Sequence, residues 1–295
     1  MPLLAQNNLS ESALLKVIGD DRWRQLQALG GVPTSLIRDE SGIRLYATFY
    51  FLELNFSRAK PLSAYRENDL LEFHAEFGHH MKSYLDGRHV VSSNPDVWVR
   101  TSNVFIHPEG GPTKLAVSFP ANVDFENIPE MTQRPDSLDL CRQAKTKGAF
   151  FLPEPDDVPL FEGSREYVYE IDADRDLNSA GLVYFANFIS FLNLAERRIL
   201  TSLAAPVPAG VIDARSTYYR RIGFYGNARA TDRLGIRMQA SARVIENGKG
   251  RSADFSINHI VRRLSDEKEI VISSCRKVAP LPAGTEVERW LDSLA

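Results

Sequence analysis

Hydrophobic and polar positions follow one order twice along the chain: a helical pattern, then a series of strand patterns. In the first half, apolar residues recur at helical spacing over residues 9–31, with Ser10 as an N-cap. Gly19 and Asp20 interrupt this pattern, which predicts two short helices instead of one. Strand-like segments follow at residues 44–56, 70–77, 89–92, 97–107 and 114–120.

The second half repeats this order after a connection rich in proline and charge. A strand and a polar turn lead into a helix from about Gly181 to Leu203, which Pro206 and Pro208 end. Its strands are predicted at 166–171, 216–224, 233–244, 252–264 and 269–278, with Asn247-Gly248 as a hairpin turn. We therefore expect a tandem duplication, with one domain in residues 1–150, a second in residues 151–295 and the connection at about 123–160.

Two segments are apolar on nearly every side. The strand at 44–56 has apolar or aromatic residues on both faces, with Tyr46 and Tyr50 on the same face, so both faces should be covered. The helical segment at 182–194 reads LVYFANFISFLNL. Because a surface helix would carry a polar face, we expect a curved sheet to wrap around this one.

Composition and charge exclude several classes of function. The 295 residues include 35 basic and 38 acidic side chains, so no net field attracts nucleic acid or an anionic membrane. Two cysteines, Cys141 and Cys275, cannot form a disulfide framework. With no apolar run of transmembrane length and no N-terminal signal, we expect a cytoplasmic protein. Nucleotide-binding, zincin and hydrolase-elbow motifs are missing, and His79-His80 lacks further ligands at suitable spacing, so no metal site is expected.

The segment at residues 176–198, DLNSAGLVYFANFISFLNLAERR, resembles the helix motif of hot-dog thioesterases of the hydroxybenzoyl-CoA type. The resemblance implies a double hot-dog fold of class α+β, in which each half is a long helix wrapped by a curved antiparallel sheet. It breaks at Asn178, where the thioesterases carry a catalytic aspartate, because an amide cannot act as a general base. The histidine and carboxylate pair of hot-dog dehydratases is also missing at matching positions. The positions that fit the thioesterase motif are Gly181, Val183, Asn187 and Phe188.

The chain as a whole is similar to the leinamycin-type family of bifunctional acyltransferase/decarboxylases, through segments at 42–50, 64–71 and 176–188. This resemblance implies an enzyme of polyketide biosynthesis that decarboxylates malonyl- or methylmalonyl-CoA and loads the resulting acyl group onto an acyl carrier protein. It implies a homodimer, and no cofactor beyond the coenzyme A of the substrate and the phosphopantetheine of the carrier. The tyrosine that this family uses corresponds to Tyr46, with Tyr50 as the alternative.

Decarboxylation of a malonyl thioester leaves an enolate, which hydrogen-bond donors can stabilise by about 3–4 kcal/mol each. A helix N-terminus near residue 181 would bring together the Asn178 amide, the Ser179 hydroxyl and the Gly181 N–H. We take these three residues and Tyr46 as candidate catalytic residues, although Asn178 and Ser179 would equally serve as helix caps. Candidate substrate-binding residues are Tyr50, Tyr184, Arg220 and Arg221, the arginines as phosphate contacts.

Two other functions stay open. A thioesterase acting on acyl-CoA or acyl carrier protein could place its base elsewhere, for example at Glu170, Asp172 or Asp174. A non-catalytic thioester-binding protein could keep the fold without the chemistry. Asn178 argues against the thioesterase, and its combination with Tyr46 argues against the non-catalytic protein.

Overall fold

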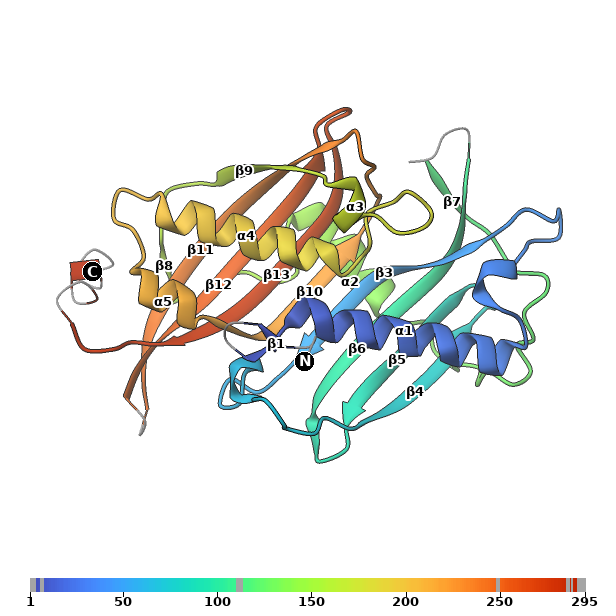
Figure 1. Cartoon of the computed structure of the whole chain (residues 1–295), viewed down its shortest axis with the longest axis horizontal. Coiled ribbons are helices and arrows are strands. Elements are labelled where there is room, and N and C mark those ends of the chain that lie inside the picture. Colours follow the sequence, from blue (N-terminus) through green and yellow to red (C-terminus); the bar gives the residue numbers. More distant parts are fainter. Residues whose placement is uncertain are drawn as a thin grey trace.

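One antiparallel sheet forms the body of the protein, with helices on both of its faces (Figure 1). The computed structural model describes residues 4–5, 8–109, 114–247, 250–284, 287 and 289–290. The strand order is β4-β5-β6-β3-β10-β13-β12-β11-β8, with β7 beside β6 and β9 beside β11. The bounds are β3 (Tyr46–Asn55), β4 (Phe73–His80), β5 (Tyr84–Val91), β6 (Asn94–Pro108), β7 (Leu115–Val117), β8 (Val158–Pro159), β9 (Arg165–Glu170), β10 (Ser216–Phe224), β11 (Arg233–Asn247), β12 (Gly250–Arg263) and β13 (Lys268–Pro280).

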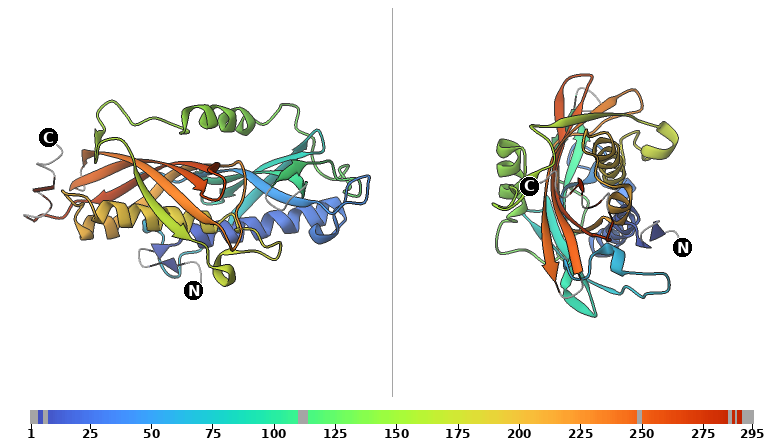
Figure 2. Two further views of the ribbon diagram at one scale, coloured as in Figure 1. Left: turned by 90° about the horizontal axis from the view of Figure 1, so that it is seen from above. Right: turned by 90° about the vertical axis from the view of Figure 1, so that its left-hand side faces the viewer.

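Two long helices lie on one face of this sheet and a shorter helix lies on the other (Figure 2). α1 (Glu11–Gly30) lies over the strands of the first half, and α4 (Asn187–Thr201) lies over those of the second. α2 (Ser137–Lys147) covers the opposite face. The sheet is continuous because β3 pairs with β10. The short elements are β1 (Leu4–Ala5), β2 (Asn8–Leu9), η1 (Thr34–Leu36), η2 (Leu62–Ala64), α3 (Ala173–Asp176) and α5 (Ala209–Ala214).

The first helix is a single helix, so the predicted break at Gly19 and Asp20 is wrong. Ser10 caps it as predicted, since its side chain accepts a hydrogen bond from the N–H of Ala13. Gly19 serves packing: a Cβ at this position would come within 2.7 Å of the Phe185 ring. The glycine therefore lets the segment before α4 approach α1 closely.

Each predicted strand has a counterpart in the sheet, and the main differences are in β5, β7 and the connection. β5 begins at Tyr84 and not at 89, because Asp86 and Gly87, a pair typical of turns, lie within the strand, where Asp86 is ion-paired with Arg100 of β6. The connection contains α2, which the proline-rich pattern did not predict. β7 is shorter than the predicted strand at 114–120. The predicted Asn247-Gly248 turn lies partly outside the described residues, although β11 and β12 pair up to their shared end.

The second long helix begins at Asn187 and not at Gly181, which corrects the predicted start. The residues before it form a tight loop, closed by an antiparallel bridge between Leu177 and Val183. Gly181 has a φ of +70°, a backbone conformation that glycine adopts at little cost. Residues 178–181 therefore form a turn of the loop, and α4 begins six residues after Gly181.

The main apolar core fills the space between the two long helices and the sheet. Phe188 and Leu192 of α4 are fully buried against Ile222 of β10 and Val271 of β13. Burying each such side chain stabilises the fold by roughly 1.5–3 kcal/mol. In the part of α4 predicted to be apolar on nearly every side, up to residue 194, only Ser190 is exposed; Arg197 is exposed further along, and Glu196 is buried with its charge. Within the described ranges, no helix is long and apolar enough to cross a membrane.

Candidate functional site

A cavity of about 300 Å³ lies where the beginning of β3 meets the loop before α4, and we call it the tyrosine cavity. The strand pairing explains its position. β3 pairs with β6 from Tyr46 onward, whereas its pairs with β10 begin only at Phe51. The first residues of β3 therefore lack the neighbouring strand that the rest of β3 has. The cavity is lined by Trp23, Arg44, Tyr46, Thr48, Asn178, Ser179, Tyr184, Phe185 and Asn227, among others.

Four of the residues predicted from the sequence line this one cavity: Tyr46, Asn178, Ser179 and Tyr184. They come from both halves of the chain, since Tyr46 belongs to β3 and the other three to the loop before α4. Burial, with a smaller contribution from the Asp20 carboxylate, raises the pKa of Tyr184 to about 12. Its hydroxyl therefore stays protonated at neutral pH and can donate a hydrogen bond.

Asn178 holds its own loop together. Its side-chain oxygen accepts hydrogen bonds from the N–H groups of Ala180 and Leu182, at 2.9 and 3.2 Å. Its Nδ2 group has no hydrogen bond within the described part of the chain, and the side chain is exposed at the cavity. The amide is thus oriented through its oxygen and free to donate through its nitrogen.

Gly181 does not supply the predicted N–H donor. Its N–H donates to the carbonyl oxygen of Asn178 at 2.9 Å, so the turn already uses it. The residue is also not among those that line the cavity. Because α4 begins only at Asn187, the free N–H groups of its N-terminus do not lie at residues 178–181 as predicted.

The buried carboxylate of Asp176 stabilises this loop through its hydrogen bonds. Asp176 accepts hydrogen bonds from the Tyr169 hydroxyl at 2.7 Å and from the N–H of Asp172 at 2.9 Å. Burial alone would raise the pKa of Asp176, but these bonds and the neighbouring Arg175 guanidinium hold it below its usual range. Asn187 adds two hydrogen bonds from its amide to the carbonyls of Arg175 and Asp176. The carboxylate oxygens of Asp176 are therefore both used in hydrogen bonds within this loop, and these bonds hold the segment that carries Asn178.

Tyr50 does not line the tyrosine cavity. Its ring lies 6.2 Å from that of Tyr84, and Tyr84 pairs with Val104, the strand partner of Thr48. Because Tyr46 and Thr48 are two positions apart, Tyr46 and Tyr50 share a face of the sheet, as predicted. The Tyr50 hydroxyl forms a 2.7 Å hydrogen bond with Ser137 of α2. Burial raises its pKa well above the usual value, so Tyr50 stays protonated there.

The two predicted arginines also lie away from the tyrosine cavity. Arg221 is ion-paired with Glu53 of β3, at 2.8 Å. Arg220 is fully buried and ion-paired with Glu11 of α1. A phosphate contact at a pocket mouth requires an accessible guanidinium, and Arg220 does not offer one.

Arg44 is a feature of the cavity that the sequence analysis did not single out. It is the only charged residue in the described lining of the tyrosine cavity. Its guanidinium lies 4.8 Å from the centre of the Tyr46 ring, in cation–π contact. Among the described residues it forms no ion pair, so its charge is available to a bound carboxylate. An isolated arginine before a strand carries no spacing signal that would have revealed this role.

The described lining of this cavity holds no Asp, Glu, His or Cys. The bases considered for a thioesterase lie elsewhere: Glu170, Asp172 and Asp174 are exposed, and Asp172 caps α3. The cavity can therefore donate hydrogen bonds, stack on aromatic rings and pair with one anion. It offers no side chain that would deprotonate a water molecule at neutral pH.

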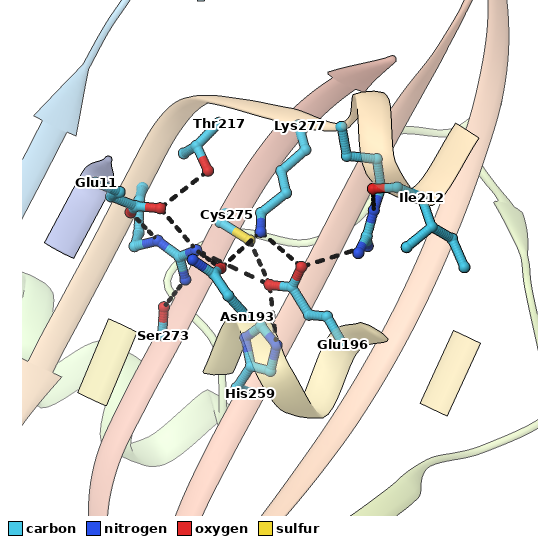
Figure 3. A network of polar contacts seen from close by, with 11 residues as sticks. Glu11, Asn193, Glu196, Ile212, Thr217, His259, Ser273, Cys275 and Lys277 are labelled. Atoms are coloured by element: carbon cyan, nitrogen blue, oxygen red, sulfur yellow. Dashed lines mark hydrogen bonds and ion pairs between the residues drawn. The ribbon is translucent and has the colours of Figure 1, made fainter. Parts of the chain in front are cut away.

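A second polar centre lies under α4 and is dominated by buried charges (Figure 3). Glu196 is fully buried, and its Oε2 accepts hydrogen bonds from Lys277 at 2.6 Å and from Arg215 at 3.3 Å. Arg220 lies 3.9 Å from its other oxygen. Burial alone would raise the pKa of Glu196, but Lys277, Arg215 and their neighbours hold it at about 2. We call this set, together with Glu11, Thr217, His259 and Cys275, the buried ion network.

Three atoms of this network are close enough to suggest a metal site. Ligand atoms of Glu196, His259 and Cys275 lie within 4.8 Å of one another. However, the carboxylate that would hold the ion is already bonded to Lys277 and Arg215. Because these cations repel a divalent metal, the donor set fits a metal poorly.

Neither a protein-family model nor a curated protein matches the sequence. Solved structures do match the fold. A protein described as an oleoyl thioesterase from Lactobacillus plantarum superposes with a TM-score of 0.58 at 11% identity, covering 94% of this chain and 91% of its own. A 12:0-ACP thioesterase from Umbellularia californica gives a TM-score of 0.51 at 10% identity, covering 94% and 89%. At such identities the likeness establishes the fold: the chain is an α+β protein with the double hot-dog architecture.

Proposed function

We propose that the tyrosine cavity binds an acyl-CoA with a free carboxylate on its α-carbon, decarboxylates it and passes the acyl group to an acyl carrier protein. The observation that supports this best is the lining of the cavity. It combines one cation without an ion-pair partner among the described residues, Arg44, with neutral donors, and its described lining holds no carboxylate or histidine. Decarboxylation of a malonyl-type thioester needs charge stabilisation and no base, so this composition suits it.

The reaction balances with the groups at hand. The bond between the carboxylate carbon and the α-carbon breaks, CO₂ leaves, and the electron pair moves to the thioester as an enolate. Arg44 would orient the carboxylate, and the free Nδ2 group of Asn178 with the Ser179 hydroxyl would donate to the enolate oxygen. The α-carbon then takes a proton, for which the protonated Tyr184 hydroxyl is a candidate donor.

Transfer to the carrier requires attack by a thiolate on the restored thioester carbonyl, with the C–S bond to coenzyme A breaking. The carrier's thiolate can attack directly, with coenzyme A leaving as its thiolate. Alternatively the Tyr46 oxygen accepts the acyl group first, its phenol proton passes to the departing coenzyme A thiolate, and the carrier's thiolate then takes the acyl group from Tyr46. The second route uses the position of Tyr46 at the beginning of β3, within the cavity wall. The same donors would stabilise the oxyanion of the tetrahedral intermediate.

Hydrolysis is the competing outcome, because the solved structures that share the fold are thioesterases by name. It would need a base to activate water, and the described lining has none. The two activities leave different products, so one experiment separates them.

The test is to incubate the full chain with malonyl-CoA or methylmalonyl-CoA, with and without a holo acyl carrier protein, and to follow the intact mass of the carrier. An acetyl or propionyl increment supports the proposal. Free acid alone would support a thioesterase, and unchanged acyl-CoA would support a non-catalytic protein. We expect Arg44→Gln to lower kcat/KM for decarboxylation by about 100-fold, because the variant loses the charge that orients the substrate carboxylate. Arg24→Gln, an exposed arginine outside the cavity lining, is the matched control and should keep full activity.

Asn178→Asp tests the electrostatic part of the proposal. A carboxylate at this position would repel both the substrate carboxylate and the enolate, so decarboxylation should fall by at least tenfold. Free acid should appear in its place if the restored carboxylate can act as a base. Faster decarboxylation in this variant would contradict the proposed role of Asn178 as a neutral donor.

A further inference from the structure

We propose that the protein has a second binding site, for a small oxyanion such as a phosphate or carboxylate group, in a cavity beside the buried ion network. This cavity, which we call the charged cavity, measures about 340 Å³. It lies between the first residues of α1, the middle of α4 and the start of β10. It shares no lining residue with the tyrosine cavity.

The first argument is an excess of buried positive charge. Arg215, Arg220 and Lys277 share two buried carboxylates, Glu11 and Glu196. Other titratable groups of the network do not supply a compensating charge. Burial lowers the pKa of His259 to about 3, so its ring is neutral at pH 7. Burial likewise raises the pKa of the Cys275 thiol to about 11. A net positive charge shielded from water is costly, and a bound anion would relieve that cost.

Two of these cations, Arg215 and Lys277, line the cavity. Figure 3 shows the amine of Lys277 between Asn193 and Glu196. Lys277 donates to Asn193 at 2.8 Å and to Glu196 at 2.6 Å, and its amine has a third N–H. Arg215 donates through Nε to the Ile212 carbonyl and through Nη1 to Glu196. Its Nη2 has no hydrogen bond within the described residues. Donors therefore remain for a ligand.

The backbone adds to this potential. The cavity contains the start of α1, whose 20 residues align their peptide dipoles with the positive end at Glu11. Ser10 uses its side chain to bind the N–H of Ala13, which leaves the N–H groups of Glu11 and Ser12 without a helical partner. At the rim, Arg197 and Asp213 pair with each other and contribute no net charge. An anion is consequently the ligand class that this cavity favours.

Ser190 provides a variant that leaves the network intact. It is exposed on α4 and lines the charged cavity, and none of the bonds of the network involves it. Ser190→Asp would place a negative charge in the cavity, whereas Ser190→Asn introduces a side chain of nearly the same size as aspartate but without a charge. Any difference between the two variants therefore reports electrostatics in the cavity and not a loss of packing.

The experiment is a titration of the full chain with sodium phosphate and, separately, with sodium acetate, by calorimetry and thermal unfolding at an ionic strength held constant with sodium chloride. We expect at least one of the two anions to bind and to raise the unfolding temperature. Ser190→Asp should weaken this binding at least tenfold, and Ser190→Asn should leave it within about twofold of the wild type. The two arms tell a phosphate site from a carboxylate site.

Two results would overturn the proposal. One is that neither anion stabilises the protein more than chloride does. The other is that Ser190→Asp binds as tightly as Ser190→Asn. Arg44→Gln should retain anion binding in full, because Arg44 lies in the tyrosine cavity. If Arg44→Gln abolished it, the anion would belong to that cavity, and the second site would be disproved while the proposed function would stand.

Discussion

The tyrosine cavity and the charged cavity occupy corresponding places in the two halves of the molecule. The first lies where the chain entering α4 meets the beginning of β3. The second lies where the chain entering α1 meets the beginning of β10. β3 and β10 are the neighbouring antiparallel strands that join the halves. The same position in the fold therefore occurs once in each half, and the side chains that line it differ in chemistry between the two halves.

The two cavities differ in whether their cations are already paired with carboxylates of the protein. In the tyrosine cavity a single cation, Arg44, is exposed and has no described carboxylate partner. At the charged cavity the cations are bound to the buried carboxylates Glu11 and Glu196, and burial makes each of these charges costly unless it is paired. The first arrangement leaves charge for a substrate. The second ties α1, α4, β10 and β13 together, and leaves one charge in excess.

The strongest test of this contrast is to remove Glu196, the centre of the buried ion network. Glu196→Gln should destabilise the fold by about 3–5 kcal/mol, because Arg215 and Lys277 would stay buried without their counter-charge. Urea denaturation measures this loss. The matched control is Asp213→Asn, which breaks the half-exposed pair with Arg197 and should cost no more than about 1 kcal/mol.

A loss below about 1 kcal/mol for Glu196→Gln would show that Glu196 is not the main counter-charge of Arg215 and Lys277. It would mean that water or rearranged side chains form hydrogen bonds with these cations instead. In that case the difference between the two cavities would be one of shape and not of charge.

The next largest effect concerns pH. Burial lowers the pKa of His259 to about 3 in the folded state, against 6.5 in the unfolded chain. Between these values the unfolded state binds the extra proton, so stability falls as the pH falls from 6.5 towards 3. From pH 7 to pH 5 this amounts to about 2 kcal/mol. His259→Gln should remove that part of the decline, as measured by urea denaturation at each pH.

The control for this prediction is His74→Gln, which alters an exposed histidine of β4 and should leave the pH dependence unchanged. Burial also lowers the pKa values of His79 and His89, so the His259 variant keeps a weaker decline over the same range. Parallel curves for the wild type and His259→Gln would contradict the prediction, because they would show that folding does not lower the pKa of His259. Glu196 acts at lower pH, between its ordinary pKa of 4.5 and about 2.

The sequence predicted the order of the elements because hairpins and helices are local patterns. The strands from 216 to 278 lie within a few residues of their predicted bounds, since alternation and turn residues determine them. It also brought Tyr46, Asn178, Ser179 and Tyr184 into one proposal, and the structure places all four at one cavity.

What the sequence could not predict depends on contacts between distant residues. The bulge in β3 that places Tyr50 and Leu52 on opposite faces of the sheet depends on the register with β6. The late start of α4 depends on the Leu177–Val183 bridge and on the hydrogen bonds of Asp176. The buried ion network was missed because its partners are far apart in the chain. Glu11 and Arg220 are separated by 209 positions, so no spacing relates them.

Two tyrosines of β3, four positions apart, offer the finest test, because only Tyr46 lines the tyrosine cavity. Tyr46→Phe removes a hydroxyl from this cavity and should lower malonyl-CoA turnover at least tenfold, with an unchanged free energy of unfolding. Tyr50→Phe removes the hydrogen bond to Ser137 of α2 and should cost about 1 kcal/mol of stability with turnover retained. Turnover and urea denaturation of both variants measure the two effects. If Tyr50→Phe abolished turnover while Tyr46→Phe did not, the reactive cavity would lie under α2. The correspondence between the two cavities would then describe the fold and not the function.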